Sequence, residues 1–156
     1  MSGRRTLTLM VIMIGSCAAG ACKDLALVSN KANTVTEVTL PELVRISKGQ
    51  TERWPDGMPV TFVTRSPVSP DMKIALDKIY GVGREEAANI IANSNRNRMK
   101  RPLIVIVDSD EMVLKKVLIT RGAIGLVDVY SITGAVNVMR IGGKLPLEPG
   151  YTLHGK

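Results

Sequence analysis

The chain has 156 residues, of which 45% are hydrophobic, and 21 Lys and Arg against 14 Asp and Glu give it a net charge of +7. This length fits one domain of ordinary size, and the composition supports a buried core rather than disorder. One histidine and two cysteines are too few for a structural zinc site or a disulfide framework. The single His154 stands close to the last residue, where chains usually fray, which disfavours a histidine-dependent hydrolase.

The first segment has the three parts of an export signal. Arg4 and Arg5 precede a short apolar stretch, which leads into a run of small residues that ends at Cys22. The charge-free residues 6–22 are fewer than the roughly 20 apolar residues that a membrane-spanning helix needs. We therefore expect residues 1–21 to be a signal peptide and residues 22–156 to form an extracytoplasmic domain, in the periplasm or anchored to a membrane.

Either cysteine is a candidate for lipid attachment. Residues 19–22 (Ala-Gly-Ala-Cys) resemble a bacterial lipobox, in which the cysteine is lipidated and becomes the first residue; residues 14–17 form a second candidate. The alternative is that both cysteines belong to the tail of the signal and are removed with it, or that Cys22 stays as a spare thiol. The sequence leaves both open, with Cys22 as the candidate attachment site, and we expect membrane contact only through the signal or a lipid anchor.

Short apolar runs and helical patterns alternate through the first half of the domain. Residues 25–28 predict a buried strand, and Thr39 with Glu42 forms a capping-box pattern that opens a helix ending at Gly49. Residues 54–57 (Trp-Pro-Asp-Gly) predict a turn. Residues 59–64 predict the next strand.

The second half continues the same alternation. Ser69 as N-cap and Pro70 at the first helical position predict a helix that runs to Gly81, followed by a helix over residues 84–93. A strand over residues 103–107 precedes a long helix from Ser109 to Arg121. Strands over residues 123–127 and 136–141 and an extended tail complete the prediction.

These elements predict an α/β fold. Five strands and four helices are expected around one sheet, and uniformly apolar strands indicate that helices cover both of its faces. The expected architecture is a single three-layer lobe of about five mostly parallel strands.

Four blocks, in order, carry a resemblance to a known family: LALVSNKAN (25–33), VTLPELVRISKGQTERWPDGMPVTFVTRS (38–66), RGAIGLVDV (121–129) and VNVMRIGGKLPLEPGYTLHG (136–155). The chain resembles the second lobe of type 2 periplasmic binding proteins, in the branch of the phosphate-binding protein of phosphate ABC transporters. The resemblance implies a periplasmic-binding-protein-like domain over residues 22–156.

The resemblance also implies a ligand site. In that family an Arg at the end of the strand, followed by Ser-Gly-Thr at a helix start, binds phosphate. Arg65 and Ser69 match this spacing with Ser66 between them, whereas Pro70 replaces the Gly and Asp71 replaces the Thr. Pro70 has no N–H to donate and Asp71 adds negative charge, so both weaken an oxyanion site. The alternative is a plain strand–turn–helix cap in which Arg65 is solvated or paired with Asp71.

The function implied is that of an extracytoplasmic solute-binding protein. It would bind phosphate or a related oxyanion without catalysis, cofactor or metal, with an ABC transporter or another envelope protein as partner. Complete members of the family close two lobes on the ligand, and this chain is expected to build only one. We therefore expect weak binding and a homodimer through the exposed lobe face. The alternative is a ligand-free interaction or assembly protein of the cell envelope with the same fold.

Two other patterns are weaker. The basic loop at residues 96–101 contains no aromatic residue for base stacking, so we expect a solvated connector rather than a nucleic-acid site. Contact of this loop with anionic lipid headgroups stays an alternative. The carboxylates of Asp108, Asp110 and Glu111 stand at a helix start, where capping and the helix dipole explain them. No general acid–base pair emerges, and we expect no enzyme.

Overall fold

The computed structural model describes residues 23–155, so the predicted signal peptide and both cysteines lie outside the described residues. The strands are β1 (Leu25–Ser29), β2 (Glu37–Val38), β3 (Thr61–Arg65), β4 (Ile104–Val107), β5 (Ala123–Asp128), β6 (Asn137–Val138) and β7 (Arg140–Ile141). The helical segments are α1 (Leu40–Ser47), η1 (Pro70–Met72), α2 (Lys73–Ala75), η2 (Leu76–Tyr80), α3 (Arg84–Ser94), α4 (Asp110–Ile119) and η3 (Val129–Ser131). Within the described part of the chain, no helix is long and apolar enough to cross a bilayer.

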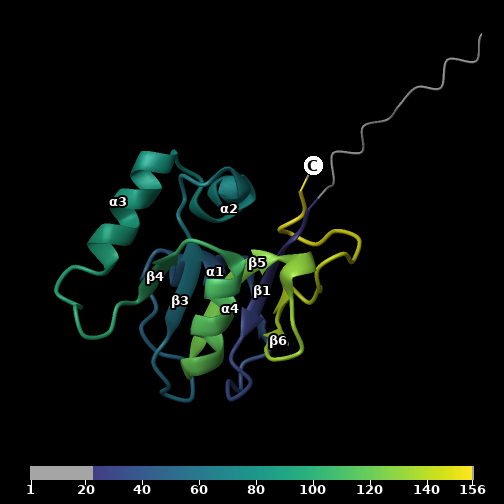
Figure 1. The fold of residues 1–156 in the computed structure, drawn as a ribbon, viewed down its shortest axis with the longest axis horizontal. Helices are drawn as coiled ribbons and strands as arrows, with labels where there is room; N and C mark the ends of the chain where they lie inside the picture. Colours follow the sequence, from purple (N-terminus) through teal and green to yellow (C-terminus); the bar gives the residue numbers. More distant parts are fainter. Residues whose placement is uncertain (1–22, 156) are drawn as a thin grey trace, which may run out of the picture.

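The predicted α/β architecture is confirmed. Five strands form the main sheet in the order β4-β3-β5-β1-β6 (Figure 1). Strand β3 is parallel to β4 and β5, whereas β1 runs antiparallel to β5 and β6. Four of the five strands therefore share one direction, and only β1 opposes them.

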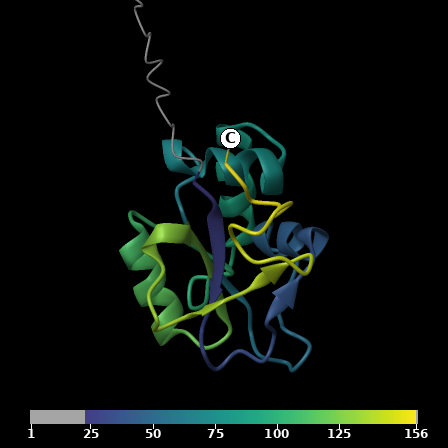
Figure 2. The same ribbon diagram turned by 90° about the vertical axis from the view of Figure 1, so that its right-hand side faces the viewer.

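Helices cover both faces of the sheet, as the apolar strands predict. Figure 2 shows α4 on one side of β1 and α1 on the other. The larger apolar cluster lies on the α1 side and includes Phe62, Leu43 and Ile79, all fully or almost fully buried. The smaller cluster packs Val113 and Val117 of α4 against Val63 and its neighbours. Alternate side chains of each strand thus pack into two separate hydrophobic cores, one on each face of the sheet.

The prediction of one strand over residues 136–141 is wrong. The chain changes sheets at Met139, which is fully buried. Before it, β6 pairs with β1 at the edge of the main sheet; after it, β7 pairs in parallel with β2 in a separate two-stranded sheet. The run of apolar residues does not show this change, because both halves bury alternate side chains in the same way.

The helix predicted from Ser69 to Gly81 is present but irregular. It begins as the 3₁₀ turn η1, passes through α2 and ends in the π-helical η2, where Gly81 adopts a φ of 65°. Ser69 stands at the N-cap position, but its side chain makes no capping hydrogen bond, which corrects the prediction. Its backbone carbonyl accepts instead, from the N–H of Met72 at 3.0 Å. Helix α4 also ends earlier than predicted, at Ile119 rather than Arg121.

The capping box of α1 provides a pH-dependent test. The N–H of Thr39 donates to Glu42 at 2.7 Å, and this bond lowers the pKa of the Glu42 carboxyl below its ordinary value. A lowered folded-state pKa contributes stability above the unfolded value, and that stability is lost as the pH falls through the folded value. Urea unfolding should therefore show a stability gap between wild type and Glu42→Gln at pH 7 that closes below about pH 4.

The hydroxyl of the same box has its own control. Thr39→Ala should cost about 1 kcal/mol at pH 7, whereas Thr39→Ser, which keeps the hydroxyl, should cost much less. Equal losses in the two variants would contradict the assigned cap.

Gly125 of β5 sets how closely α4 approaches the sheet. A Cβ at this position would lie 2.5 Å from Val113 Cγ1 and 3.1 Å from the carbonyl oxygen of Val63. Gly125→Ala should therefore destabilise the protein by about 1–3 kcal/mol through overpacking. Gly134→Ala is the matched control, because a Cβ there meets no atom within 4 Å. Urea midpoints of the two variants that shift equally would contradict the close approach.

Candidate functional site

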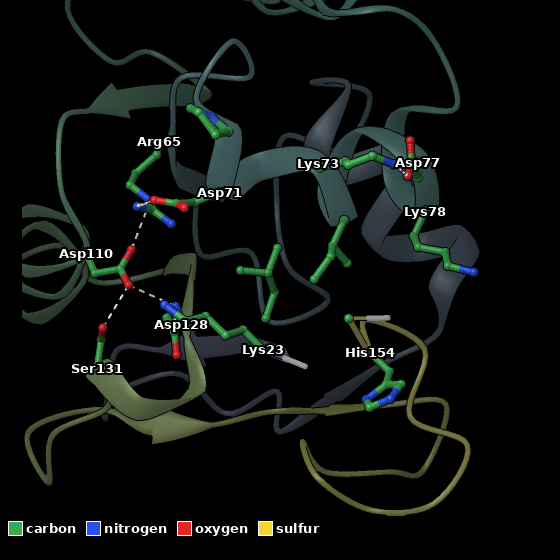
Figure 3. Close-up of a pocket in the computed structure, with 14 residues that line it drawn as sticks. Lys23, Arg65, Asp71, Lys73, Asp77, Lys78, Asp110, Asp128, Ser131 and His154 are labelled. Carbon is green, nitrogen blue, oxygen red and sulfur yellow. Dashed lines mark hydrogen bonds and ion pairs between the residues drawn. The ribbon is translucent and has the colours of Figure 1, made fainter. Parts of the chain in front are cut away.

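The carboxyl ends of the parallel strands place three charged side chains at one edge of the sheet. Arg65 ends β3, Asp110 opens α4 directly after β4, and Asp128 ends β5. In α/β sheets this edge is where ligands usually bind. A pocket of about 770 Å³ lies here, and these three side chains line it together with Asp71 and His154 (Figure 3).

Two carboxylates hold the guanidinium of Arg65. Asp71 Oδ2 lies 2.8 Å from Nη1, and Asp110 Oδ1 lies 3.0 Å from Nε. The side chains of Arg65 and Asp110 are both 13% exposed, whereas that of Asp71 is 64% exposed. Among the described residues, Nε and Asp110 Oδ1 have no hydrogen-bond partner of ideal geometry, so each is stabilised by the other's charge. Arg65 thus has one enclosed partner and one exposed partner.

Asp110 is itself fixed by the end of β5. Its Oδ2 accepts a hydrogen bond from the Asp128 N–H at 2.9 Å and another from the Ser131 hydroxyl at 2.8 Å. Ser109 caps α4 by accepting from the N–H of Met112 at 3.2 Å, which leaves the Asp110 carboxylate available for these contacts. Sequence reasoning assigned Asp110 to the helix dipole and missed its role beside Arg65. The signal for that role was its position, three residues after the end of a predicted strand that lies parallel to the one ending at Arg65.

The structure separates the predicted ligand residues. Arg65 lines the pocket, but Ser66 and Ser69 do not. The Ser66 carbonyl accepts from the Ser69 N–H at 2.9 Å, so both serines belong to the turn that leads into η1. Pro70 and Asp71, the two departures from the family pattern, do line the pocket. The sequence left Arg65 either solvated or paired with Asp71, and the structure shows the pair.

The remaining charges of the pocket are mostly paired among themselves. Lys73 lies 2.8 Å from Asp77 and Lys23 lies 3.5 Å from Asp128, measured between nitrogen and carboxylate oxygen. Lys78 is the one lining lysine or arginine with no ion pair among the described residues. Four Lys and Arg face four Asp, so the pocket is close to neutral before a ligand enters.

The tail closes one side of the pocket. His154 Nδ1 lies 2.5 Å from Oδ1 of the buried Asp24, and the Leu147 N–H donates to the other oxygen of Asp24 at 2.8 Å. Tyr151 donates its hydroxyl to the Leu25 carbonyl at 2.9 Å. Burial, and then the Asp24 carboxylate, raise the pKa of Tyr151, so this hydroxyl stays a neutral donor. The tail is therefore a packed wall of the pocket.

The pocket presents the guanidinium of Arg65, paired with Asp71 and Asp110, and the described residues form no metal site. Within residues 23–155, no group of three His, Cys, Asp or Glu side chains could hold a metal ion. What the pocket presents is a guanidinium, which binds carboxylates and phosphates through paired N–H donors. Its chemistry is therefore that of anion recognition, with Asp71 as a competitor.

No protein-family model and no curated protein sequence matches this chain. Solved structures do. The ABC-type phosphate transport receptor of Vibrio cholerae matches with a TM-score of 0.61 at 22% identity over 85% of this chain and 54% of its own. PstS of Borrelia burgdorferi matches with a TM-score of 0.67 at 19% identity, over 86% of this chain and 55% of its own.

A putative phosphate ABC transporter substrate-binding protein of Clostridium perfringens, solved with bound phosphate, matches with a TM-score of 0.61 at 21% identity. That match covers 78% of this chain and 46% of the other. The chain thus spans about half the length of the solved proteins it matches. It has the fold of one part of phosphate ABC transporter substrate-binding proteins, as the resemblance in sequence implied.

The two carboxylates beside Arg65 should differ in their effect on stability. Asp110→Ala leaves a largely enclosed guanidinium, the Asp128 N–H and the Ser131 hydroxyl without their partner, and should cost about 3 kcal/mol. Asp71→Ala removes only an exposed ion pair and should cost less than about 1 kcal/mol. Chemical unfolding at neutral pH measures both. Equal losses would contradict the division into an enclosed and an exposed partner.

Proposed function

We propose that the protein is an extracytoplasmic solute-binding-like protein that holds phosphate or a related oxyanion without catalysis. The observation that carries the proposal is the guanidinium of Arg65, positioned by Asp110 inside a pocket at the carboxyl ends of the parallel strands. The fold shared with phosphate transport receptors supports the same ligand class. An ABC transporter or another envelope protein would be the partner.

Binding would proceed by exchange at one end of the guanidinium. Asp110 keeps its ion pair with Nε, while the exposed Asp71 leaves Nη1 and the anion takes its place. An arginine has five N–H donors, so an oxyanion could accept two of them in parallel. Ser66 and Ser69 are proposed to add donors, which requires the turn at residues 66–72 to move toward the pocket.

A single lobe supplies only part of the donors that enclose an oxyanion. We therefore propose weak binding by this lobe alone, strengthened where a second lobe, a partner protein or a second copy covers the pocket. The extracytoplasmic location rests on the signal-like residues 1–21, with residues 22–156 as the domain and Cys22 as the proposed lipid attachment site.

One observation favours a second function. Asp71 already occupies Arg65, and Pro70 lacks the N–H that would face an anion. A lobe with these two residues could serve as a ligand-free interaction or assembly protein of the cell envelope. The two functions differ in whether an anion can displace the Asp71 carboxylate.

Calorimetric titration of phosphate, then sulfate, into the purified chain tests the proposal. We expect weak saturable binding that Arg65→Ala abolishes. Asp71→Asn should tighten it about tenfold, equivalent to about 1.4 kcal/mol, because the competing charge is gone. Asp77→Asn is the matched control: it removes an equal charge from the same pocket but breaks an ion pair with Lys73 instead of Arg65.

Equal tightening by both substitutions would contradict a specific role of Asp71. If neither wild type nor Asp71→Asn gives saturable heat up to millimolar anion, the solute-binding function is wrong and the interaction function replaces it. Sedimentation of the same samples tests the proposed homodimer, which fails if the chain stays monomeric at high concentration.

A further inference from the structure

A second pocket lies at the other end of β3, and all the charged residues that line it are Lys or Arg. It has a volume of about 400 Å³ and is lined by Thr61, Lys100, Arg101, Pro102, Val105, Lys116, Ile119, Thr120 and Arg121. Its four charged residues are all cations, and no described carboxylate lines it. They come from the loop before β4, from α4 and from the turn after α4. We call it the basic pocket.

The basic pocket is separate from the Arg65 site. Thr61 begins β3 and Arg65 ends it, so about 13 Å of extended strand lies between the two pockets. No residue lines both. The strands and helix that build the basic pocket, β3, β4 and α4, lie next to one another in Figure 1. The basic pocket is therefore built by its own set of residues, from β3, β4, the loop before β4 and the end of α4.

Ion pairs do not explain the four cations of the basic pocket. None forms an ion pair with a carboxylate of residues 23–155, and residues 1–22 and 156 contain no Asp or Glu. Neighbouring cations do have partners: Arg98 pairs with Glu52, and Lys115 pairs with Glu111. The basic pocket thus brings together four positive charges that have no ion-pair partner in the described part of the chain.

Capping of α4 does not require these cations either. The carbonyls of Val117 and Leu118 at the end of α4 accept hydrogen bonds from Asn30 Nδ2, each at 2.9 Å. Asn30 thus supplies two of the donors that the end of α4 needs, while Lys116 in the last turn still interacts favourably with the helix dipole. The hydrogen bonds at the Val117 and Leu118 carbonyls do not involve Lys116 or Arg121, and both of these residues line the pocket.

We propose that the basic pocket binds a small anion that carries two or more phosphate groups. Four like charges on three segments repel one another, and a polyvalent anion relieves that repulsion at several points at once. A single phosphate would reach only part of the set. The volume lies in the range of small-molecule sites, and the hydroxyls of Thr61 and Thr120 add donors. Ile119, 76% exposed, with Pro102 and Val105 provides an apolar surface for the rest of the ligand.

Calorimetric titration with inorganic triphosphate, pyrophosphate and phosphate tests the assignment on the full chain. We expect saturable binding that weakens in the order triphosphate, pyrophosphate, phosphate and that falls as salt rises. The double variant Lys116→Gln/Arg121→Gln should weaken triphosphate binding at least tenfold. Lys100→Gln/Arg101→Gln, which changes only the loop, should do the same and guards against a folding defect in α4.

The matched control is Lys31→Gln/Arg84→Gln, which removes two exposed positive charges that line neither pocket and form no ion pair among the described residues. It should leave triphosphate affinity within twofold of wild type. Equal losses in all three double variants would overturn the proposal, because attraction by net charge alone would explain them. Failure of this test leaves the Arg65 site unaffected, since Arg65→Ala reports on that site separately.

Lipid vesicles distinguish the source of the phosphate groups. Vesicles with and without an anionic phospholipid are sedimented with wild type and with the Lys116→Gln/Arg121→Gln variant. We expect no more binding to the anionic vesicles than to the neutral ones at physiological salt. Binding to anionic vesicles that the double variant abolishes, without saturable triphosphate binding, would overturn the small-anion assignment in favour of a membrane surface. Absence of saturable binding to any probe at low salt would also overturn it.

Discussion

The carboxylate of Asp110 connects the parts of the lobe that meet at the Arg65 pocket. One of its oxygens faces Arg65 at the end of β3, and the other accepts from the backbone at the end of β5 and from η3. Because Asp110 is also the first residue of α4, the helix start is tied to two strands by one side chain. Without it, the guanidinium would lose its enclosed ion-pair partner and keep only the exposed Asp71. The anion-binding hypothesis depends on this ion pair, because it holds the guanidinium charge inside the pocket where an oxyanion could reach its other N–H donors.

The pockets at the two ends of β3 differ in their balance of positive and negative side chains. At the carboxyl end, lysines and arginine are matched by an equal number of aspartates, and most are in direct ion pairs. At the amino end, four cations gather with no carboxylate within the described lining. The net charge of +7 is therefore not spread evenly. In the Arg65 pocket an anion must replace a carboxylate, so the net charge attracting it is small. In the basic pocket four unpaired cations attract an anion directly, so binding there should weaken more strongly as the salt concentration rises.

Local signals predicted most of the fold, and long-range pairing explains the errors. Thr39 and Glu42 form the expected capping box, and Gly81 ends its helix in the expected left-handed conformation. The β2–β7 sheet was missed because each strand has two residues and gains its partner from about a hundred positions away. The crossing at Met139 was missed for the same reason: the choice between two sheets is made by β1 and β2, not by residues 136–141.

The sequence predicted Arg65 as a site residue but not Asp110, the carboxylate that pairs with it. Arg65 was found because its spacing to Ser69 matches a family pattern, whereas Asp110 lies forty-five positions further along the chain. The spacing of the two residues does not by itself predict the contact, which follows from the parallel pairing of β3 and β4 that sets Arg65 opposite Val107. The Asp71 contact was foreseen as one alternative, because Asp71 lies in the same turn and only six positions from Arg65.

The exposure of Asp71 decides how an anion could compete. An exposed ion pair contributes at most about 1 kcal/mol, whereas hydrogen bonds to charged groups contribute about 1.5–3 kcal/mol each. An oxyanion that accepts two N–H donors from Arg65 therefore exceeds what Asp71 supplies, although it also meets the enclosed negative charge of Asp110. The net free energy that the anion gains by replacing Asp71 is therefore small. A binding free energy near −4 kcal/mol corresponds to a Kd of about 1 mM, which is the weak binding expected of this lobe alone. Tighter binding requires donors that this lobe does not direct into the pocket, and these would come from whatever covers it.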